Sequence, residues 1–274
     1  MTNKYYNDAI IGNKKIIASY TEKGELQRLC YPEVDGRQFI DYFQTGVKIN
    51  DSNLIYLHQD INNKYSQEYI ENTNILKTNI ENTYFNFNIE QIDFALVDKN
   101  IIVKKYIFKN NNSVDLDTNF IINSKILSND LERFGSRIVD KGIIQYNHNY
   151  AMAIFSNKNL YGHKLNDVQS TLQSAVIMDK DYIGMSNEIA ISYDIGVIHS
   201  GEQQELNIFI LVNENNEIEE KIQKCVKLNT NTEFENVKNY WNLYVENHSK
   251  IKIESNKNDF YKKLLEIYNR TILL

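Results

Sequence analysis

The sequence contains few of the residues that form tight turns or covalent cross-links. Its 274 residues include one proline, ten glycines, two cysteines and one tryptophan. The cysteines, Cys30 and Cys225, are far apart in the sequence, and isolated thiols of this kind predict small buried side chains rather than a disulfide. Because there is neither a CxxC pair nor a closely spaced histidine pair, the sequence predicts no zinc site. It predicts no cofactor of another kind.

Long apolar runs and clusters of positive charge are also missing. No window approaches the roughly 18 apolar residues that a membrane span needs, and residues 1–13 contain no apolar segment of signal-peptide length. The net charge is −6 and no basic block occurs, which argues against a nucleic-acid partner. We therefore expect a cytoplasmic protein with no membrane or nucleic-acid partner, or a secreted one if a signal peptide was trimmed.

The scarce turn-forming residues gather in residues 20–50. This stretch holds the only proline, Pro32, and three of the ten glycines. Residues 21–24 predict a hairpin turn between two short strands. Residues 32–36 predict a fixed corner, which is followed by a longer extended run. The concentration of these residues indicates that the backbone geometry is specified here.

Most of the chain has the period-two alternation of β-strands. Residues 84–92 alternate polar and apolar side chains, which predicts a strand with one buried and one solvated face. Further strands are predicted at residues 9–12, 16–20, 25–31, 101–109, 116–126, 143–145, 150–156, 189–198 and 205–212. These strands follow one another without intervening helices, so the predicted fold class is all-β, a sandwich or barrel. The length of the region favours a sandwich of two large antiparallel sheets.

After residue 213 the apolar residues follow a helical period. Residues 215–228 predict a helix with acidic side chains in its first turns. Residues 232–247 predict a second helix, with Thr232 as its N-cap and Glu235 three residues later. Both helices have one apolar face, which predicts that they pack against another part of the protein.

The last residues predict a helix without a partner. Residues 251–254 are expected to be short and extended, and residues 256–274 form an amphipathic helical pattern. Apolar side chains cover more than half of its circumference, and no stop signal occurs before Leu274. We expect this helix to be the first of a helical domain that is absent from the sequence. Its exposed apolar face also makes self-association a candidate property.

The segment GELQRLCYPEVDGRQFIDYF, residues 24–43, resembles the amino-terminal region of prokaryotic glucoamylases of glycoside hydrolase family 15. In that family an opening hairpin leads through a segment of the form G-E-apolar-x-x-apolar-x-Y-P into a β-sandwich. The upstream sequence AIIGNKKIIASY and the downstream sequence YIFKNNNSVDL are similar to the same pattern. The resemblance extends from about residue 8 to the final helix.

The resemblance implies both an architecture and a role. It implies a galactose mutarotase-like supersandwich at residues 1–213, a helical linker at residues 214–254 and the first helix of an absent (α/α)6 barrel at residues 255–274. In this family the barrel hydrolyses α-glucosidic bonds with inversion, using two glutamates as acid and base. Because both glutamates belong to the barrel, the resemblance implies no catalytic residue here.

The expected role is therefore a non-catalytic domain that packs against and supports the barrel of a glucan-hydrolysing enzyme. Two alternatives remain open from the sequence. The first is a carbohydrate-binding module for starch-like α-glucans, and the second is an aldose mutarotase-like enzyme. The expected partners are the barrel domain and, as a further candidate, α-glucan.

Four residues are candidates for an interdomain or ligand contact. Asp35, Arg37 and Asp41 lie in and after the corner, where a loop of the sandwich would face the barrel. The competing interpretation is a local salt-bridged turn between Asp35 and Arg37, because Asp-Gly is a common turn dipeptide. Trp241 lies on the apolar face of the second helix, where packing is favoured over ligand binding.

Tyrosines and histidines give weaker signals. Five tyrosines suggest sugar stacking, but with 19 tyrosines in the chain, chance clustering is the favoured explanation: Tyr31, Tyr42, Tyr56, Tyr65 and Tyr69. A mutarotase would use a histidine as acid and a glutamate as base. None of the five histidines lies in a motif that matches this role, and no metal ligand is predicted.

Overall fold

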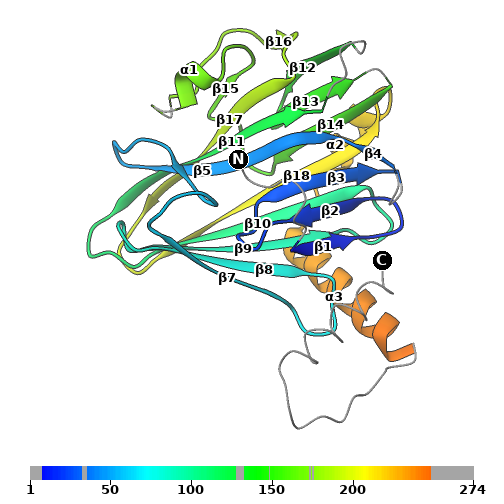
Figure 1. Cartoon of the computed structure of the whole chain (residues 1–274), viewed down its shortest axis with the longest axis horizontal. Helices are drawn as coiled ribbons and strands as arrows, with labels where there is room; N and C mark the ends of the chain where they lie inside the picture. The colour runs from blue at the N-terminus through cyan, green and yellow to red at the C-terminus, as the bar shows by residue number, and fades with distance from the viewer. Residues whose placement is uncertain are drawn as a thin grey trace.

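Two antiparallel sheets packed face to face form the body of the protein (Figure 1). The structure is a computed structural model, and it describes residues 8–32, 36–127, 133–147, 149–172, 174 and 176–247. The predicted sandwich of two large antiparallel sheets is confirmed. The linker segment at residues 251–254 and the final helix at residues 256–274 lie outside the described residues.

Each sheet has nine strands. The order in the first sheet is β1 (Ala9–Gly12), β2 (Ile17–Tyr20), β3 (Leu26–Tyr31), β5 (Ile40–Ile49), β11 (Leu116–Ile126), β17 (Glu188–Ile198) and β15 (Gly162–Lys164), with β4 (Arg37–Gln38) on β3 and β6 (Ile55–Tyr56) on β5. The order in the second sheet is β16 (Ile183–Gly184), β12 (Phe134–Val139), β13 (Gly142–Asn147), β14 (Tyr150–Ser156), β18 (Gln203–Glu214), β10 (Ile101–Asn110), β9 (Phe87–Ala95), β8 (Leu76–Asn82) and β7 (Asn63–Tyr69).

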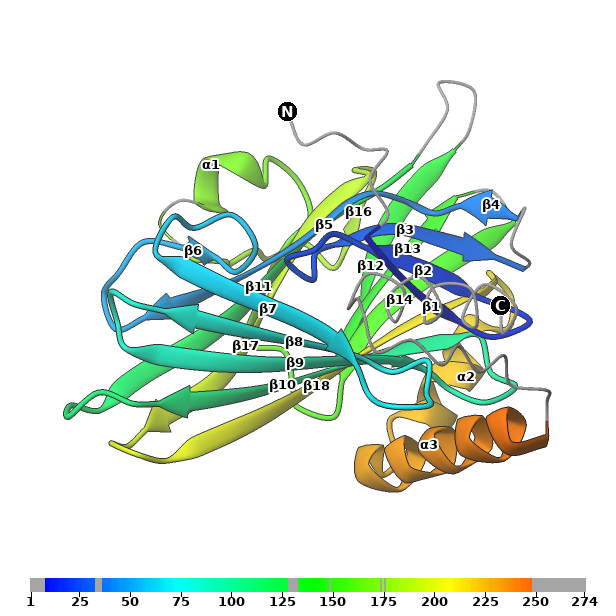
Figure 2. The same ribbon diagram turned by 60° about the horizontal axis from the view of Figure 1, so that its bottom comes forward.

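The helices of the described residues lie outside the sandwich. They are α1 (Gln169–Leu172), α2 (Ile218–Cys225) and α3 (Thr230–Asn247). Figure 2 shows α1 and α3 on opposite sides of the molecule, with α3 beneath the second sheet. No helix in this part of the chain combines the length and the apolar character needed to cross a membrane.

The predicted hairpin turn between β2 and β3 is present and contacts the opposite sheet. The Thr21 hydroxyl accepts the backbone N–H groups of Lys23 and Glu25 at 3.3 and 3.1 Å, and Gly24 N–H donates to Thr21 O at 2.9 Å. Gly24 has φ of +86°, which favours glycine. A Cβ atom at Gly24 would lie 2.8 Å from Thr78 Oγ1 on β8, so the close approach of the two sheets also requires glycine here.

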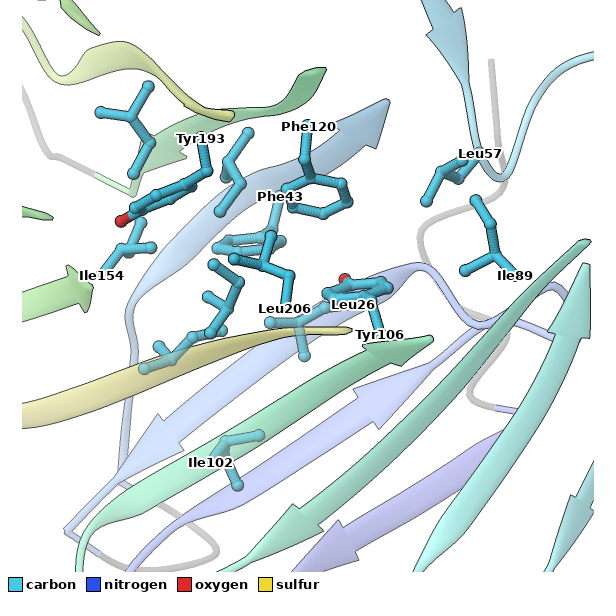
Figure 3. Close-up of a cluster of buried hydrophobic side chains, with 14 of the residues drawn as sticks. Leu26, Phe43, Leu57, Ile89, Ile102, Tyr106, Phe120, Ile154, Tyr193 and Leu206 are labelled. Carbon is cyan, nitrogen blue, oxygen red and sulfur yellow. The ribbon is translucent and has the colours of Figure 1, made fainter. Parts of the chain in front are cut away.

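Aromatic side chains from both sheets interdigitate in the centre of the sandwich (Figure 3). Tyr106 on β10 and Phe120 on β11 have ring centroids 4.7 Å apart, and Phe108 contacts Phe120 at 5.8 Å. All three are fully buried. Burial of side chains of this size contributes about 1.5–3 kcal/mol each to stability, so this layer is a main source of cohesion between the sheets.

Part of the outer face of the second sheet is covered by α2 and α3. Phe94 on β9 makes an edge-to-face contact with Phe234 on α3 at 5.7 Å, and Trp241 and Cys225 are buried in the same apolar cluster. As a result, residues 92–95 are buried on both faces of β9, whereas its first half follows the predicted alternation. Cys225 is buried, as expected, whereas Cys30 is only half-buried.

Two local expectations are wrong. The strand predicted at residues 84–92 begins only at Phe87, because Asn82 Oδ1 accepts the N–H groups of Tyr84 and Phe85 and forms a turn. The N-cap of α3 is not Thr232. The side chain of Asn229 accepts two N–H groups at the start of the helix, each at 3.1 Å, and the helix begins at Thr230.

A buried ion pair lies between the sheets. Lys104 Nζ on β10 is 2.6 Å from Asp93 Oδ1 on β9, and both side chains are at most 1% exposed. The ammonium group also lies 4.7 Å from the ring centroid of Tyr20 on β2, so its charge reaches the first sheet. Burial raises the pKa of Asp93 and lowers the pKa of Lys104, and the attraction between the two charges offsets this effect.

Replacement of Lys104 by methionine should strongly destabilise the protein. The Lys104→Met variant leaves Asp93 buried without its counter-charge, a change that typically costs about 3–5 kcal/mol of unfolding free energy. Urea denaturation of the 274-residue chain followed by circular dichroism would measure the loss.

Lys105, the next residue, provides the matched control. Lys105 is on the opposite face of the same strand, where its Nζ lies 2.8 Å from Glu205 on β18 and 2.7 Å from Asn231 Oδ1. The side chains of Lys105 and Glu205 are 12% and 38% exposed, so this pair is less buried than the pair of Asp93 and Lys104. Lys105→Met should cost only about 0–1 kcal/mol. Equal losses of unfolding free energy in Lys104→Met and Lys105→Met would contradict a special contribution of the buried pair to stability.

Candidate functional site

His58 belongs to the buried polar group between the sheets. It is 4% exposed, and its Nε2 lies 3.1 Å from Gln91 Oε1. The Gln91 amide donates to Asp93 at 2.6 Å and to Gly24 O at 2.8 Å, so it joins the ion pair to the opening hairpin. Burial, reinforced by the positive charge of Lys104, lowers the pKa of His58 to about 3. The imidazole is neutral near pH 7 and closed to solvent, which makes it structural.

The other described histidines are nearer the surface. His163 Nε2 lies 2.9 Å from the backbone carbonyl of Asp181, and His199 Nδ1 lies 2.9 Å from Asp115 in exposed turns. The remaining two, His148 and His248, lie outside the described residues. None of the side-chain hydrogen bonds of the described histidines is to a glutamate, so these bonds give the mutarotase alternative no support.

A polar group occupies the outer face of the first sheet. The Tyr42 hydroxyl on β5 donates to Glu188 Oε1 on β17, and the side-chain amide of Gln169 on α1 donates to the same oxygen. We call Tyr42, Glu188 and Gln169 the Tyr42 group. Burial, the hydrogen bond to Glu188 and its negative charge all raise the pKa of Tyr42. Tyr42 therefore keeps its proton and acts as a hydrogen-bond donor.

Asp41 lies beside the Tyr42 group at an irregularity of β5. Lys125 on β11 is opposite Tyr42 and Ile126 is opposite Ile40, so Asp41 is the extra residue of a β-bulge. Asp41 Oδ2 is 3.3 Å from Lys125 Nζ, and this ammonium lies 5.9 Å from the Tyr42 ring centroid. The bulge thus places two adjacent side chains, Asp41 and Tyr42, in one polar surface.

The side chains of this surface are engaged in hydrogen bonds and an ion pair. Glu188 accepts from two donors, and Asp41 is paired with Lys125. Neither carboxylate is therefore a free general base. Within the described ranges, no three His, Cys, Asp or Glu side chains come together in a way that would hold a metal ion.

The four residues proposed from the sequence do not form one site. Asp35 lies outside the described residues. Arg37 is on β4, where its backbone pairs with Tyr31 on β3, and Asp41 is on the outer face of the first sheet. Trp241 is 5% exposed and packs on the second sheet. The structure therefore separates Trp241 from Asp41, and it adds Glu188 and Gln169, for which the sequence contains no signal.

The five tyrosines proposed for sugar stacking are also separated. The Tyr65 hydroxyl donates to Leu57 O at 2.9 Å, and the Tyr69 hydroxyl donates to Ile10 O at 2.8 Å. These two side chains connect the edge strand β7 to other strands and loops. Tyr42 lies on the outer face of the first sheet instead. The five tyrosines therefore do not form a single aromatic platform.

Comparison with known proteins identifies the fold. No family model matches the chain. An uncharacterized glycosyl hydrolase of Methanocaldococcus jannaschii is 27% identical over 219 residues, which are 75% of this chain and 34% of that protein. A bacterial glucoamylase in complex with acarbose is similar with a TM-score of 0.71 and 15% identity, covering 87% of this chain and 37% of the glucoamylase.

A third comparison concerns an aldose epimerase homologue of C. elegans. It has a TM-score of 0.50 and 9% identity, and covers 75% of this chain and 98% of that protein. The expected galactose mutarotase-like sandwich is therefore confirmed. The chain spans about a third of the length of the glycosyl hydrolase and of the glucoamylase.

Acid should destabilise the protein partly through His58. The ordinary histidine pKa is 6.5 and the folded value is about 3, so between these values the unfolded chain binds a proton that the folded chain excludes. Stability should fall as the pH decreases through this window, by up to about 1.4 kcal/mol per pH unit. His58→Gln should remove this contribution, which urea denaturation at a series of pH values would measure.

His199→Gln is the control with the opposite sign. The hydrogen bond to Asp115 raises the pKa of His199, so its contribution is present at low pH and is lost as the pH rises through the folded value. An unchanged acid slope in His58→Gln would contradict the assignment of a buried neutral imidazole.

Proposed function

We propose that this chain is the non-catalytic sandwich domain of a glucoamylase-like glycoside hydrolase, where it packs against and supports an α-glucan-hydrolysing barrel. The observation that carries the proposal is the likeness to the glucoamylase, which extends over 87% of this chain but only 37% of that enzyme. The sequence likeness to an uncharacterized glycosyl hydrolase supports the same class of protein. The resemblance of residues 24–43 favours glycoside hydrolase family 15 as the specific family.

The surface of the sandwich supports a packing role. Several large apolar side chains are more than half exposed just before β15 and between β15 and β17, at Tyr161, Met178, Tyr182, Ile183 and Met185. Exposed apolar side chains gathered in one region mark surfaces that contact other proteins or domains. We assign this surface, together with the polar surface around Asp41, as the side that meets the barrel.

The state of the carboxylates supports a non-catalytic role. An inverting glycosidase needs a free carboxylate base and a carboxylic acid, about 6.5–9.5 Å apart with room for water. On the outer face of the first sheet, Asp41 and Glu188 are instead both engaged by neighbouring side chains.

The 274-residue chain alone should release no glucose from maltotetraose or starch and should not accelerate the mutarotation of α-glucose. A coupled glucose assay and polarimetry would measure the two activities. A purified glucoamylase and an aldose mutarotase would serve as positive controls for the same substrates.

The two assays separate the alternatives. Glucose release that co-purifies with the chain and survives repeated purification would contradict the non-catalytic role. Faster mutarotation would instead support the aldose mutarotase-like alternative. Binding of maltotetraose without any turnover leaves the proposed role intact and is the subject of the next section.

A further inference from the structure

An open hollow lies on the outer face of the second sheet, beside the start of α2. Its volume is about 940 Å³, at the upper end of the range of roughly 300–1,000 Å³ typical of small-molecule sites. The walls come from β12, β13 and β16, from the β13–β14 turn and from the segment that joins β18 to α2. Figure 1 shows these elements together at one end of the sandwich. We call this feature the α2 hollow.

One aromatic wall of the α2 hollow is Tyr146 on β13. It is half-buried, and its backbone partner on β12 is Gly135. A Cβ atom at Gly135 would lie 2.4 Å from the Tyr146 hydroxyl oxygen. The hydroxyl end of the Tyr146 ring therefore lies over β12 at Gly135, where a larger residue would clash with it. This arrangement holds the ring in place and leaves its remaining surface toward the hollow.

A second aromatic wall, Tyr150, is held from behind. Its ring makes edge-to-face contacts with Tyr31 at 6.3 Å and with Phe39 at 6.0 Å. These contacts fix the ring at the end of the sandwich, while part of Tyr150 lines the hollow. Two tyrosines that are already ordered lose little conformational entropy when a ligand packs against them.

Polar groups form the rest of the lining. Arg137 Nη1 is 2.7 Å from Glu219 Oε1 on α2, and the buried Nε of Arg137 has no hydrogen-bond partner. Glu214 and Asn216 are exposed at the rim. Asn215 N–H donates to Asn149 O at 2.8 Å, which ties the two loops of the rim together. The lining therefore offers carboxylates, amides and a guanidinium group on a fixed frame.

We propose that the α2 hollow binds a neutral oligosaccharide. A sugar ring has an apolar C–H face that packs on tyrosine, and hydroxyl groups that each donate and accept hydrogen bonds. Carboxylate and amide oxygens accept from these hydroxyls, while amide and guanidinium N–H groups donate to them. The aromatic and polar groups of the hollow supply both kinds of contact.

The charge and polarity of the lining disfavour other ligand classes. One arginine is set against two glutamates, Glu214 and Glu219, so the lining carries a net charge of −1 and repels phosphates and other anions. The many polar groups disfavour a lipid chain, which would leave them without hydrogen bonds. This binding is separate from support of a barrel, so each proposal can fail without the other.

Isothermal titration calorimetry of the 274-residue chain with maltotetraose tests the proposal. We expect saturable binding, weakened about tenfold or more in Tyr146→Ala. Gly135→Ala should weaken it as well, because the added methyl group displaces the Tyr146 ring. Tyr84→Ala is the matched control, since Tyr84 is 75% exposed in a turn of another strand pair and should leave the affinity unchanged.

A variant at the rim guards against misfolding. Asn216→Ala changes an exposed side chain and should reduce the affinity without changing the unfolding midpoint. No heat of binding with millimolar maltotetraose and cellotetraose would overturn the proposal. An affinity that remains unchanged in both Asn216→Ala and Tyr146→Ala would also overturn it. So would a loss of affinity in Tyr84→Ala as large as that in Tyr146→Ala.

Discussion

The ion pair of Asp93 and Lys104 is the constraint on which the arrangement of the sheets depends. The two residues are directly opposite in the register of β9 and β10. A slip of β9 by one residue would turn Asp93 toward the outer face and leave Lys104 between the sheets without its counter-charge. Because an unpaired charge between the sheets is costly, only one register of this hairpin is compatible with the core. The Gln91 amide extends the constraint to Gly24 O, and thus to the first sheet.

The polar group inside the sandwich is closed to solvent, which leaves function to the outer faces. Inside the sandwich, His58, Gln91 and the ion pair form contacts mainly with one another and with the backbone. On the outside, α2 and α3 cover part of the second sheet, while α1 covers part of the first. The uncovered areas carry two different surfaces. The Tyr42 group is closed by its own hydrogen bonds, whereas the α2 hollow keeps a volume open to a ligand.

The sequence predicted the strands that are rich in apolar residues and missed an edge strand that has few. It predicted the bounds of β1 and β14 because their apolar residues are β-branched or closely spaced. It did not predict β7, an edge strand with the sequence NKYSQEY and no aliphatic side chain. The corner at residues 32–36 drew attention to Asp41, but Tyr42 and Glu188 are 146 residues apart. No local sequence pattern predicts such a contact. It depends on the order of β5, β11 and β17 in the sheet, which brings Tyr42 and Glu188 together.

The same reasoning explains why the α2 hollow is invisible in the sequence. Nothing in the sequence singles out Gly135, and no strand was predicted there. Its role depends on Tyr146, which reaches it only through the register of β12 and β13. Arg137 meets Glu219 only because α2 folds back onto the second sheet after β18. A rigid sandwich can therefore carry a binding surface at little cost to its stability. The surface uses side chains of the outer face and of loops together with Tyr150, whose ring packs against the core. The core already holds their strands in position.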